Sequence, residues 1–441
     1  MNGHMPSPPP SPAVGGRGRT EKDWRREAVA GATTFFTMSY IVVVNPSILS
    51  APGTGMPFQG ALTATVLLCA VMTLLMGLYA DLPFAVAPGM GINAFFAYSI
   101  VIGSGVPWPA ALGIVFWAGV LFLVVSVTPL RQRIAMAIPP NLRTAAAAGI
   151  GIFLTFIGLR NAGLVAAHPV TLVQLGPLDR KTVLSMLGLL IIAMGLRRKS
   201  PFAFLAGSRS VSVAGWALGL VQLPEHWVSR PDFSSVFLKL DIRGALDPKL
   251  FGAMAAILLT DLFDSISTFV GVSQACGLLD EKGEPKNLRE GLIVDALATL
   301  GAGLAGTSSG TAYIESAAGI EAGGTTGLTS VFTGLFFLPC FFIGPLAAAV
   351  PPWATAPVLI AVGALLFKSV TRLELERFED ALPAFLTLVL IPLTFSITQG
   401  ILWGFIAQAA LYLAAGRGRE LKPSLYILAA VSVGLLVLER W

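Results

Sequence analysis

Long apolar runs separated by short polar connections make up nearly the whole chain. A helix needs about 20 mostly apolar residues to cross a bilayer. The pattern predicts fourteen such spans. They cover residues 28–49, 59–80, 84–103, 107–127, 144–165, 181–196, 201–222, 250–272, 289–305, 308–322, 326–349, 353–368, 383–397 and 399–415. A shorter apolar stretch at 424–438 is expected to lie in the membrane interface or to pack against the bundle. The fold class predicted is therefore an all-α polytopic membrane protein.

Two of these spans contain segments that are unlike ordinary helices. Residues 84–93 and 306–315 mix glycine, proline and small polar residues at what should be membrane depth. Non-helical backbone is tolerated there only when it is buried in protein or lines a cavity. Broken segments at corresponding positions of two halves indicate a transporter binding site. They fall at spans three and ten, which predicts two seven-span repeats. An odd number of spans per repeat makes the two repeats inverted.

Composition and charge agree with a membrane protein. The chain is 55% hydrophobic and 12% charged, with mean hydropathy +0.77, and its net charge of +5 does not indicate a nucleic-acid partner. With the N-terminus placed in the cytoplasm, 20 of the 29 basic residues, Arg143 among them, fall on inner segments and 7 on outer ones. That bias agrees with the positive-inside rule. The three cysteines lie far apart, so we expect no disulfide framework. Pro-rich residues 1–26 are predicted to be a disordered cytoplasmic tail.

Three carboxyl groups and one amide at membrane depth carry the predicted chemistry. A charged group there costs several kcal/mol, so such residues mark functional sites by default. Asp261 and Asp264 are three residues apart on one predicted helix, while Glu315 and Asn93 end the two broken segments. If the repeats cross, the four side chains converge. Carboxylates accept hydrogen bonds and an amide both donates and accepts, which suits a neutral heterocycle.

The acids have no obvious cationic partner in the predicted spans. His4, His168 and His226 all fall in the tail or in loops. Because burial disfavours the charged form of a carboxyl group, we expect one acid to take up a proton when substrate binds. Glu315 and Asp261 are the candidate proton carriers. Transport would then be driven by the proton gradient, and we expect no cofactor and no metal ion.

Structural interpretations of the same residues remain open. Asp264 would then satisfy hydroxyl groups such as that of Ser265, Asn93 would hold the broken segment in shape, and Asp261 or Glu315 would be a structural acid. Asp295 is expected to make a helix-to-helix hydrogen bond rather than to bind a ligand.

Three aromatic residues near the acids are candidates for stacking on a flat ligand. They are Phe35, Phe263 and Tyr313. An aromatic side chain in an apolar helix also serves as ordinary packing, and that alternative remains open for each of them.

Long motifs in the chain resemble a known family. They are residues 87–96 (APGMGINAFF), 260–265 (TDLFDS) and 313–319 (YIESAAG), with 33–40 and 383–387 in support. These segments resemble the azaguanine-resistance (AzgA-like) purine permeases, relatives of the nucleobase–ascorbate transporters. The resemblance runs from about Glu27 to the C-terminus. It places the family's substrate-binding residues on Asn93, Asp261 and Glu315, with Asp264 adjusting affinity.

The resemblance also implies an architecture, an activity and a location. It implies proton-coupled import of adenine, guanine or hypoxanthine through a bacterial inner membrane, with the N-terminus in the cytoplasm. A core domain would move against a gate domain like an elevator, and a homodimer is expected. The expected divisions are a tail (1–26), a first core segment (27–127), a first gate segment (128–222), an extracytoplasmic loop (223–249), a second core segment (250–349), a second gate segment (350–416) and a C-terminal apolar segment (417–441).

Other functions fit the sequence less well. A xanthine/uracil or an anion transporter of the same fold is the closest alternative, but three acids do not suit an anion, and the pyrimidine and xanthine branches carry a different pattern after the second broken segment. An intramembrane aspartyl protease needs two aspartates from separate helices, whereas Asp261 and Asp264 share one helix face. A channel does not need two broken half-helices.

Overall fold

A computed structural model of the chain describes residues 24–128, 139–279 and 285–440. The first-half helices are α1 (Trp24–Met38), α2 (Ile41–Leu49), α3 (Phe58–Leu78), α4 (Met90–Ala94), α5 (Trp108–Val127), α7 (Pro140–Asn161), α8 (Arg180–Arg197) and α9 (Ala203–Ala217). The second-half helices are α10 (Phe251–Cys276), α11 (Leu288–Ala305), α12 (Ser316–Glu321), α13 (Gly327–Phe337), α14 (Gly344–Ala348), α15 (Pro352–Phe367), α16 (Phe378–Thr394), α17 (Ile397–Ala414) and α18 (Pro423–Arg440).

Every one of the fourteen predicted spans overlaps at least one of these helices. Seven helical segments of the described residues are long and apolar enough to cross a membrane by themselves. The first of them, 24–49, is two helices with a break at residues 39–40. The predicted tail lies outside the described residues except for 24–26, which form the start of α1. Sequence composition placed that boundary too late because Trp24, Arg25 and Arg26 carry no apolar pattern.

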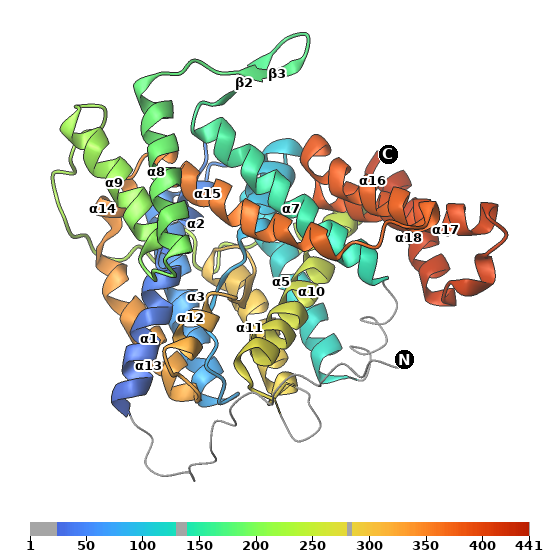
Figure 1. Cartoon of the computed structure of the whole chain (residues 1–441), viewed down its shortest axis with the longest axis horizontal. Coiled ribbons are helices and arrows are strands. Elements are labelled where there is room, and N and C mark those ends of the chain that lie inside the picture. The colour runs from blue at the N-terminus through green and yellow to red at the C-terminus, as the bar shows by residue number, and fades with distance from the viewer. Residues whose placement is uncertain (1–23, 129–138, 280–284, 441) are drawn as a thin grey trace, which may run out of the picture.

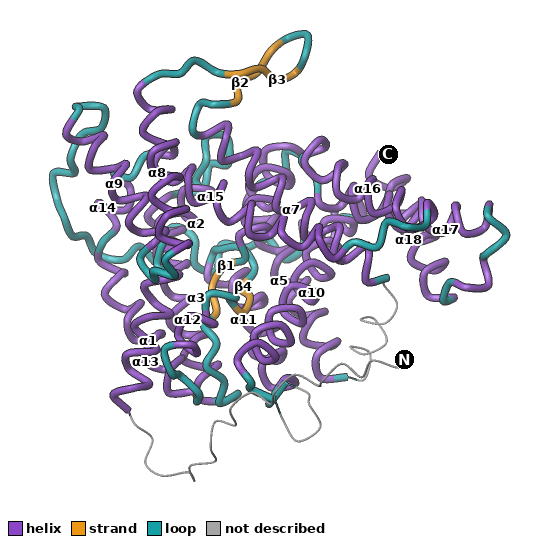
Figure 2. Tube along the Cα trace, viewed as in Figure 1, coloured by secondary structure: helices purple, strands orange, loops and turns teal. Residues whose placement is uncertain are grey.

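The two broken segments meet in the centre of the molecule as a pair of short strands (Figure 2). Strand β1 (Val86–Pro88) pairs antiparallel with β4 (Gly310–Ala312), and Ala87 lies opposite Thr311. Further backbone hydrogen bonds extend the pair at both ends, from Gly89 N to Ser309 O (3.0 Å) and from Tyr313 N to Ala85 O (2.9 Å). Both strands are fully buried. Their antiparallel pairing is the arrangement that inverted repeats produce, and it satisfies the non-helical backbone at membrane depth.

Each strand is followed by a helix that leads away from the centre. After β1 come α4 and a π-helical segment, η1 (Phe95–Gly103), and after β4 comes α12. The strand–helix composition of spans three and ten is therefore as predicted. The π-helix was not expected, because nothing in an apolar run separates it from an α-helix.

The remaining helices pack in two sets. In one set, α13 packs on α1 and α3, and α5 packs on α11; in the other, α7 packs on α15 and α16, and α8 packs on α9 and α15 (Figure 1). Glycines allow the close approach in both sets. A Cβ atom on Gly77 would clash with the carbonyl oxygen of Gly327, and one on Gly151 would lie 2.6 Å from that of Gly363. Small residues at such crossings let membrane helices approach closely.

Two features lie outside the fourteen spans. A hairpin of β2 (Val165–His168) and β3 (Leu172–Leu175), absent from the sequence prediction, projects from the connection between α7 and α8 (Figure 1). The apolar stretch 424–438 lies within α18, which packs on α17 through Leu425 and Ala429. Packing against the bundle is therefore observed, and a place in the membrane interface stays a prediction.

Candidate functional site

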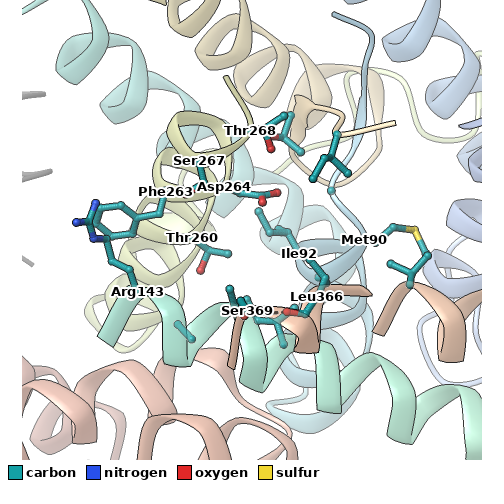
Figure 3. A pocket seen from close by; sticks show the side chains of 18 of the residues that line it. Met90, Ile92, Arg143, Thr260, Phe263, Asp264, Ser267, Thr268, Leu366 and Ser369 are labelled. Atoms are coloured by element: carbon teal, nitrogen blue, oxygen red, sulfur yellow. Dashed lines mark hydrogen bonds between the residues drawn. The ribbon is translucent and has the colours of Figure 1, made fainter. Parts of the chain in front are cut away.

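A cavity of about 440 Å³ lies where the second broken segment faces α7 and α15. Its wall is formed by α4, by the middle of α10, by residues 311–315 and, across from these, by α7, the end of α15 and Ile401 of α17. Figure 3 shows α10 side chains on one side of the cavity and Ser369 and Leu366 on another. The volume is in the range typical of small-molecule sites. The cavity extends to Arg372, which is exposed.

Two of the predicted acids face this cavity. Asp264 projects from α10 into it and is exposed to it (Figure 3). Glu315 lies at the start of α12 and is half-buried, and its Oε1 accepts a hydrogen bond of 2.8 Å from the hydroxyl of Tyr40. Neither acid has an ion-pair partner among the residues that the structure describes. Both therefore keep carboxylate oxygens available to a ligand.

The other two predicted site residues lie behind the wall. Asn93 and Asp261 are completely buried and do not line the cavity. The Nδ2 of Asn93 donates to Asn45 Oδ1 (2.9 Å), and Asp261 accepts a hydrogen bond from Thr299 of α11. The structure thus places all four residues around the strand junction but does not bring them to one surface. In this conformation, direct contact with a ligand in the cavity is open to Asp264 and Glu315 alone among the four.

Asp295 makes the helix-to-helix contact predicted from the sequence. It is completely buried on α11 and accepts a hydrogen bond from Ser265 of α10. The hydroxyl of Thr311 on β4 lies 3.5 Å from the same carboxylate oxygen. Asp295 therefore joins α10, α11 and the second broken segment.

The predicted aromatic residues divide in the same way. Phe263 and Tyr313 line the cavity, and the hydroxyl of Tyr313 donates to the carbonyl of Pro88, which ties the two broken segments together. Phe35 does not reach the cavity. Its ring packs on Phe337 of α13, with ring centroids 5.0 Å apart, and belongs to the contact between α1 and α13. Stacking of Phe35 on a ligand in this cavity is therefore not supported by its position.

Two cavity residues were missed by the sequence reasoning. The guanidinium of Arg143, in the first turn of α7, lies 5.5 Å from the centre of the Phe263 ring (Figure 3). In the sequence, Arg143 counts only as an inner-loop charge, and its place beside the start of an apolar run was the available clue. Tyr40 lies at the break between α1 and α2, and its single polar atom in an apolar run gave no signal.

The cavity offers hydrogen-bond acceptors on one wall and apolar surface on others. Asp264 and Glu315 accept hydrogen bonds, and hydroxyls such as those of Thr260 and Ser267 both donate and accept. Met90, Ile92 and Leu366 provide apolar surface (Figure 3). Such a site suits a small, flat molecule that carries several N–H groups.

Comparison with known proteins gives a consistent result. Residues 25–403 match the Permease family (Xan_ur_permease). The chain is 40% identical to the adenine permease AdeP of Escherichia coli strain K12, over 93% of this chain and 92% of that protein. It is 39% identical to the guanine/hypoxanthine permease PbuO of Bacillus subtilis, over 92% and 95% of the two chains.

Solved structures show the fold. The transmembrane domain of the cyanobacterial bicarbonate transporter BicA superimposes with a TM-score of 0.66 at 16% identity, covering 87% of this chain and 98% of that one. SLC26A9 superimposes with a TM-score of 0.63 at 9% identity, covering 90% of this chain and 66% of that one. The protein is thus an all-α integral membrane protein with fourteen spans in two inverted repeats. By the family match over residues 25–403 and the identities with AdeP and PbuO, the chain belongs to the nucleobase–ascorbate transporter family of permeases.

Proposed function

We propose that the protein imports purine nucleobases into the bacterial cytoplasm by proton symport. The observation that carries the proposal is a pair of carboxylates, Asp264 and Glu315, that face one cavity at the junction of the broken segments and have no ion-pair partner in the described part of the chain. Relatives that match nearly the whole chain are adenine permeases and guanine/hypoxanthine permeases. Transport of nucleobases is therefore the activity that the family membership supports.

The cavity explains how a purine would be held. Each of adenine, guanine and hypoxanthine has a ring N–H, and Asp264 and Glu315 supply acceptors for it. Phe263 and Tyr313 line the cavity and provide aromatic surface for the flat ring. Behind the wall, Asn93 and Asp261 would keep the strand junction and α10 in place rather than touch the ligand in this state. All three purines remain candidate substrates.

Proton coupling would use one of the acids around the strand junction. A carboxylate at membrane depth without a cationic partner is costly when charged. Of the described residues that line the cavity, Arg143 and Arg372 are the cations, and neither pairs with Asp264 or Glu315. Glu315 and Asp261 are the candidate carriers: Glu315 lines the cavity, and Asp261 is completely buried one helical turn from Asp264. Proton binding would neutralise the loaded site before it moves.

The position of the cavity supports an elevator movement. Asp264, Glu315 and Tyr40 belong to the segments expected to form the core, and Arg143 and Ser369 belong to those expected to form the gate. The site therefore lies between the two sets of helices. With the N-terminus in the cytoplasm, the exposed end at Arg372 would open inwards. This would be the inward-facing state, in which substrate is released to the cytoplasm. A homodimer remains an expectation from the family resemblance.

An anion transporter of the same fold is the second candidate. The structural likeness to BicA and SLC26A9, at 16% and 9% identity, reflects the fold alone. Arg143 and Arg372 also line the cavity, but the carboxylates of Asp264 and Glu315 would repel an anion bound at the strand junction, so that part of the site favours a neutral ligand. A xanthine or uracil transporter differs from the proposal only in the heterocycle.

Uptake by purified protein in liposomes tests the proposal. With an inward proton gradient, we expect saturable, concentrative uptake of radiolabelled hypoxanthine or adenine that unlabelled purines compete away. An uncoupler should abolish accumulation but leave exchange of labelled for unlabelled purine. Competition by uracil, xanthine or bicarbonate in place of adenine, guanine and hypoxanthine would reject the substrate. Accumulation that persists without any proton gradient would reject the coupling.

A further inference from the structure

Tyr40 joins the proposed binding acid to a helix of the opposite set. It lies between the end of α1 at Met38 and the start of α2 at Ile41, and it is 3% exposed. Its hydroxyl donates to Glu315 Oε1 at 2.8 Å, across 275 positions of sequence. Its ring packs on Phe204 of α9, with ring centroids 4.8 Å apart and planes at 45°. Phe204 is 2% exposed, so this second contact is also buried.

The hydrogen bond fixes one oxygen of a carboxylate that lines the cavity. Oε1 of Glu315 is held by Tyr40. The hydroxyl of Tyr313 is already used on Pro88, so it cannot replace Tyr40. A glutamate side chain has several rotatable bonds, and fixing one oxygen removes most of the freedom that binding would otherwise have to restrict.

We infer that Tyr40 is a positioning residue that aims the carboxylate of Glu315 at the substrate, and that Phe204 holds Tyr40 in that position. The inference rests on the proposed function and adds a residue to its site. Tyr40 orients Glu315, and the ring of Tyr40 is held by Phe204 of α9, which belongs to the other helix set. The carboxylate is therefore fully oriented only while the two helix sets are docked as they are here. Affinity for the purine would therefore depend on the contact between Tyr40 and Phe204.

The test is a mutant cycle on binding and transport. Tyr40→Phe keeps the ring and its contact with Phe204 but removes the hydroxyl. Kd for labelled adenine and for labelled hypoxanthine would be measured on purified protein, and KM and maximal rate in liposomes. We expect Tyr40→Phe to raise Kd and KM about tenfold with an unchanged maximal rate, because a hydrogen bond to a charged group is lost. In a Glu315→Gln background, the same change should raise Kd less than about threefold, because a bond to a neutral acceptor is weaker.

Phe204→Leu tests the second contact. It should raise Kd about threefold in the parent protein, in line with the loss of an aromatic pair, and should add nothing when Tyr40 is already Phe. Tyr426→Phe is the matched control. Tyr426 lies on α18, away from the cavity, and donates to the carbonyl of Gly418, so its loss should leave Kd and KM unchanged.

The outcomes separate this inference from the function on which it rests. If the parent protein binds neither adenine, guanine nor hypoxanthine, the proposed function fails and the inference fails with it. If the parent protein binds a purine but Tyr40→Phe changes Kd less than twofold, only the inference is overturned. The inference is also overturned if Tyr40→Phe raises Kd by the same factor in the parent protein and in the Glu315→Gln background, because Tyr40 would then act independently of Glu315. A lowered maximal rate with unchanged KM would assign Tyr40 a purely structural role.

Discussion

Two pairs of acids lie close to the same strand junction, yet they differ in what surrounds them. Asp264 and Glu315 face the cavity, whereas Asp261 and Asp295 are completely buried between α10, α11 and β4. Asp261 and Asp264 are one turn apart on a single helix. A rotation of about 60° around the helix axis separates residues three apart, and here that rotation puts one acid behind the wall and the other in the cavity.

The partners of the two pairs explain the difference. Each interior acid accepts a hydrogen bond from a hydroxyl on a neighbouring helix, Asp261 from Thr299 and Asp295 from Ser265. A buried carboxyl group needs such donors, because its desolvation is otherwise uncompensated. The cavity acids keep oxygens that a ligand can use. Carboxyl side chains therefore join helices in one place and are available for the proposed substrate in the other. The difference is whether donors on neighbouring helices already occupy their oxygens.

The largest effect is expected at Glu315. Glu315→Ala removes the acceptor that Tyr40 orients, and a hydrogen bond to a charged group contributes about 1.5–3 kcal/mol. We expect purine affinity to fall about a hundredfold, with little change in thermal stability because Glu315 is half-buried. Binding and melting measurements on purified protein check this. Glu225→Ala, in the exposed 223–249 loop, is the control that should change neither quantity.

The interior pair should show the reverse pattern. Asp295→Ala would remove the buried acceptor that joins Ser265 of α10 and Thr311 of β4 to α11, although Ser265 would keep its hydrogen bond to the carbonyl of Asp261. We expect the free energy of unfolding to fall by about 2 kcal/mol. Asp295→Asn keeps an acceptor and should recover about half of that loss. Purine affinity of the folded fraction should stay within twofold of the parent value. A large loss of affinity at normal stability would instead place Asp295 in the binding site.

The sequence was sufficient to predict the fold because the controlling features are local. Apolar length predicts the spans, and glycine and proline at membrane depth predict the two broken segments that pair as β1 and β4. The same local information could not tell which side of α10 faces the cavity. Asp261 and Asp264 have the same side chain and charge, and only the packing of α10 against α11 distinguishes them.

The remaining site residues depend on contacts that are distant in sequence. Tyr40 reaches Glu315 across 275 positions and Arg143 reaches Phe263 from another helix, and neither pairing leaves a local pattern. Phe35 and Phe263 look alike in sequence, since both are aromatic residues in apolar helices. The packing of α1 on α13 takes Phe35 away from the cavity, which no property of its neighbours in the chain reveals.

A smaller effect is expected at Asp264, which tests the comparison within a single helix. Asp264→Asn removes the charge of an acid that faces the cavity and has no ion-pair partner among the described residues. The amide oxygen of Asn should accept a hydrogen bond from the ligand more weakly, because bonds to neutral acceptors are roughly half as strong as bonds to a carboxylate. We therefore expect purine affinity to fall about fivefold. Thermal stability should not fall. Asp261→Asn, one turn away, should lower stability and leave affinity nearly unchanged, and titration of both variants with labelled purine distinguishes the two.

The smallest effect is expected at the contact between Arg143 and Phe263. A cation over an aromatic face contributes about 0.5–2 kcal/mol, and here it holds Phe263 in the cavity wall between α7 and α10. Arg143→Gln should therefore raise KM about threefold, and Phe263→Leu should raise it at least as much, because it also removes aromatic surface for the purine. The double variant should match Phe263→Leu alone, because the contact with Arg143 is already lost there.

Arg160→Gln is the matched control for that cycle, since Arg160 lies in the last turn of the same helix and outside the cavity. It should leave KM at the parent value. If the Arg143 and Phe263 effects multiply in the double variant, the two side chains act separately on the ligand. Arg143 would then be a direct ligand contact supplied by α7. The division into binding acids on α10 and α12 and a merely supporting wall on α7 would no longer hold.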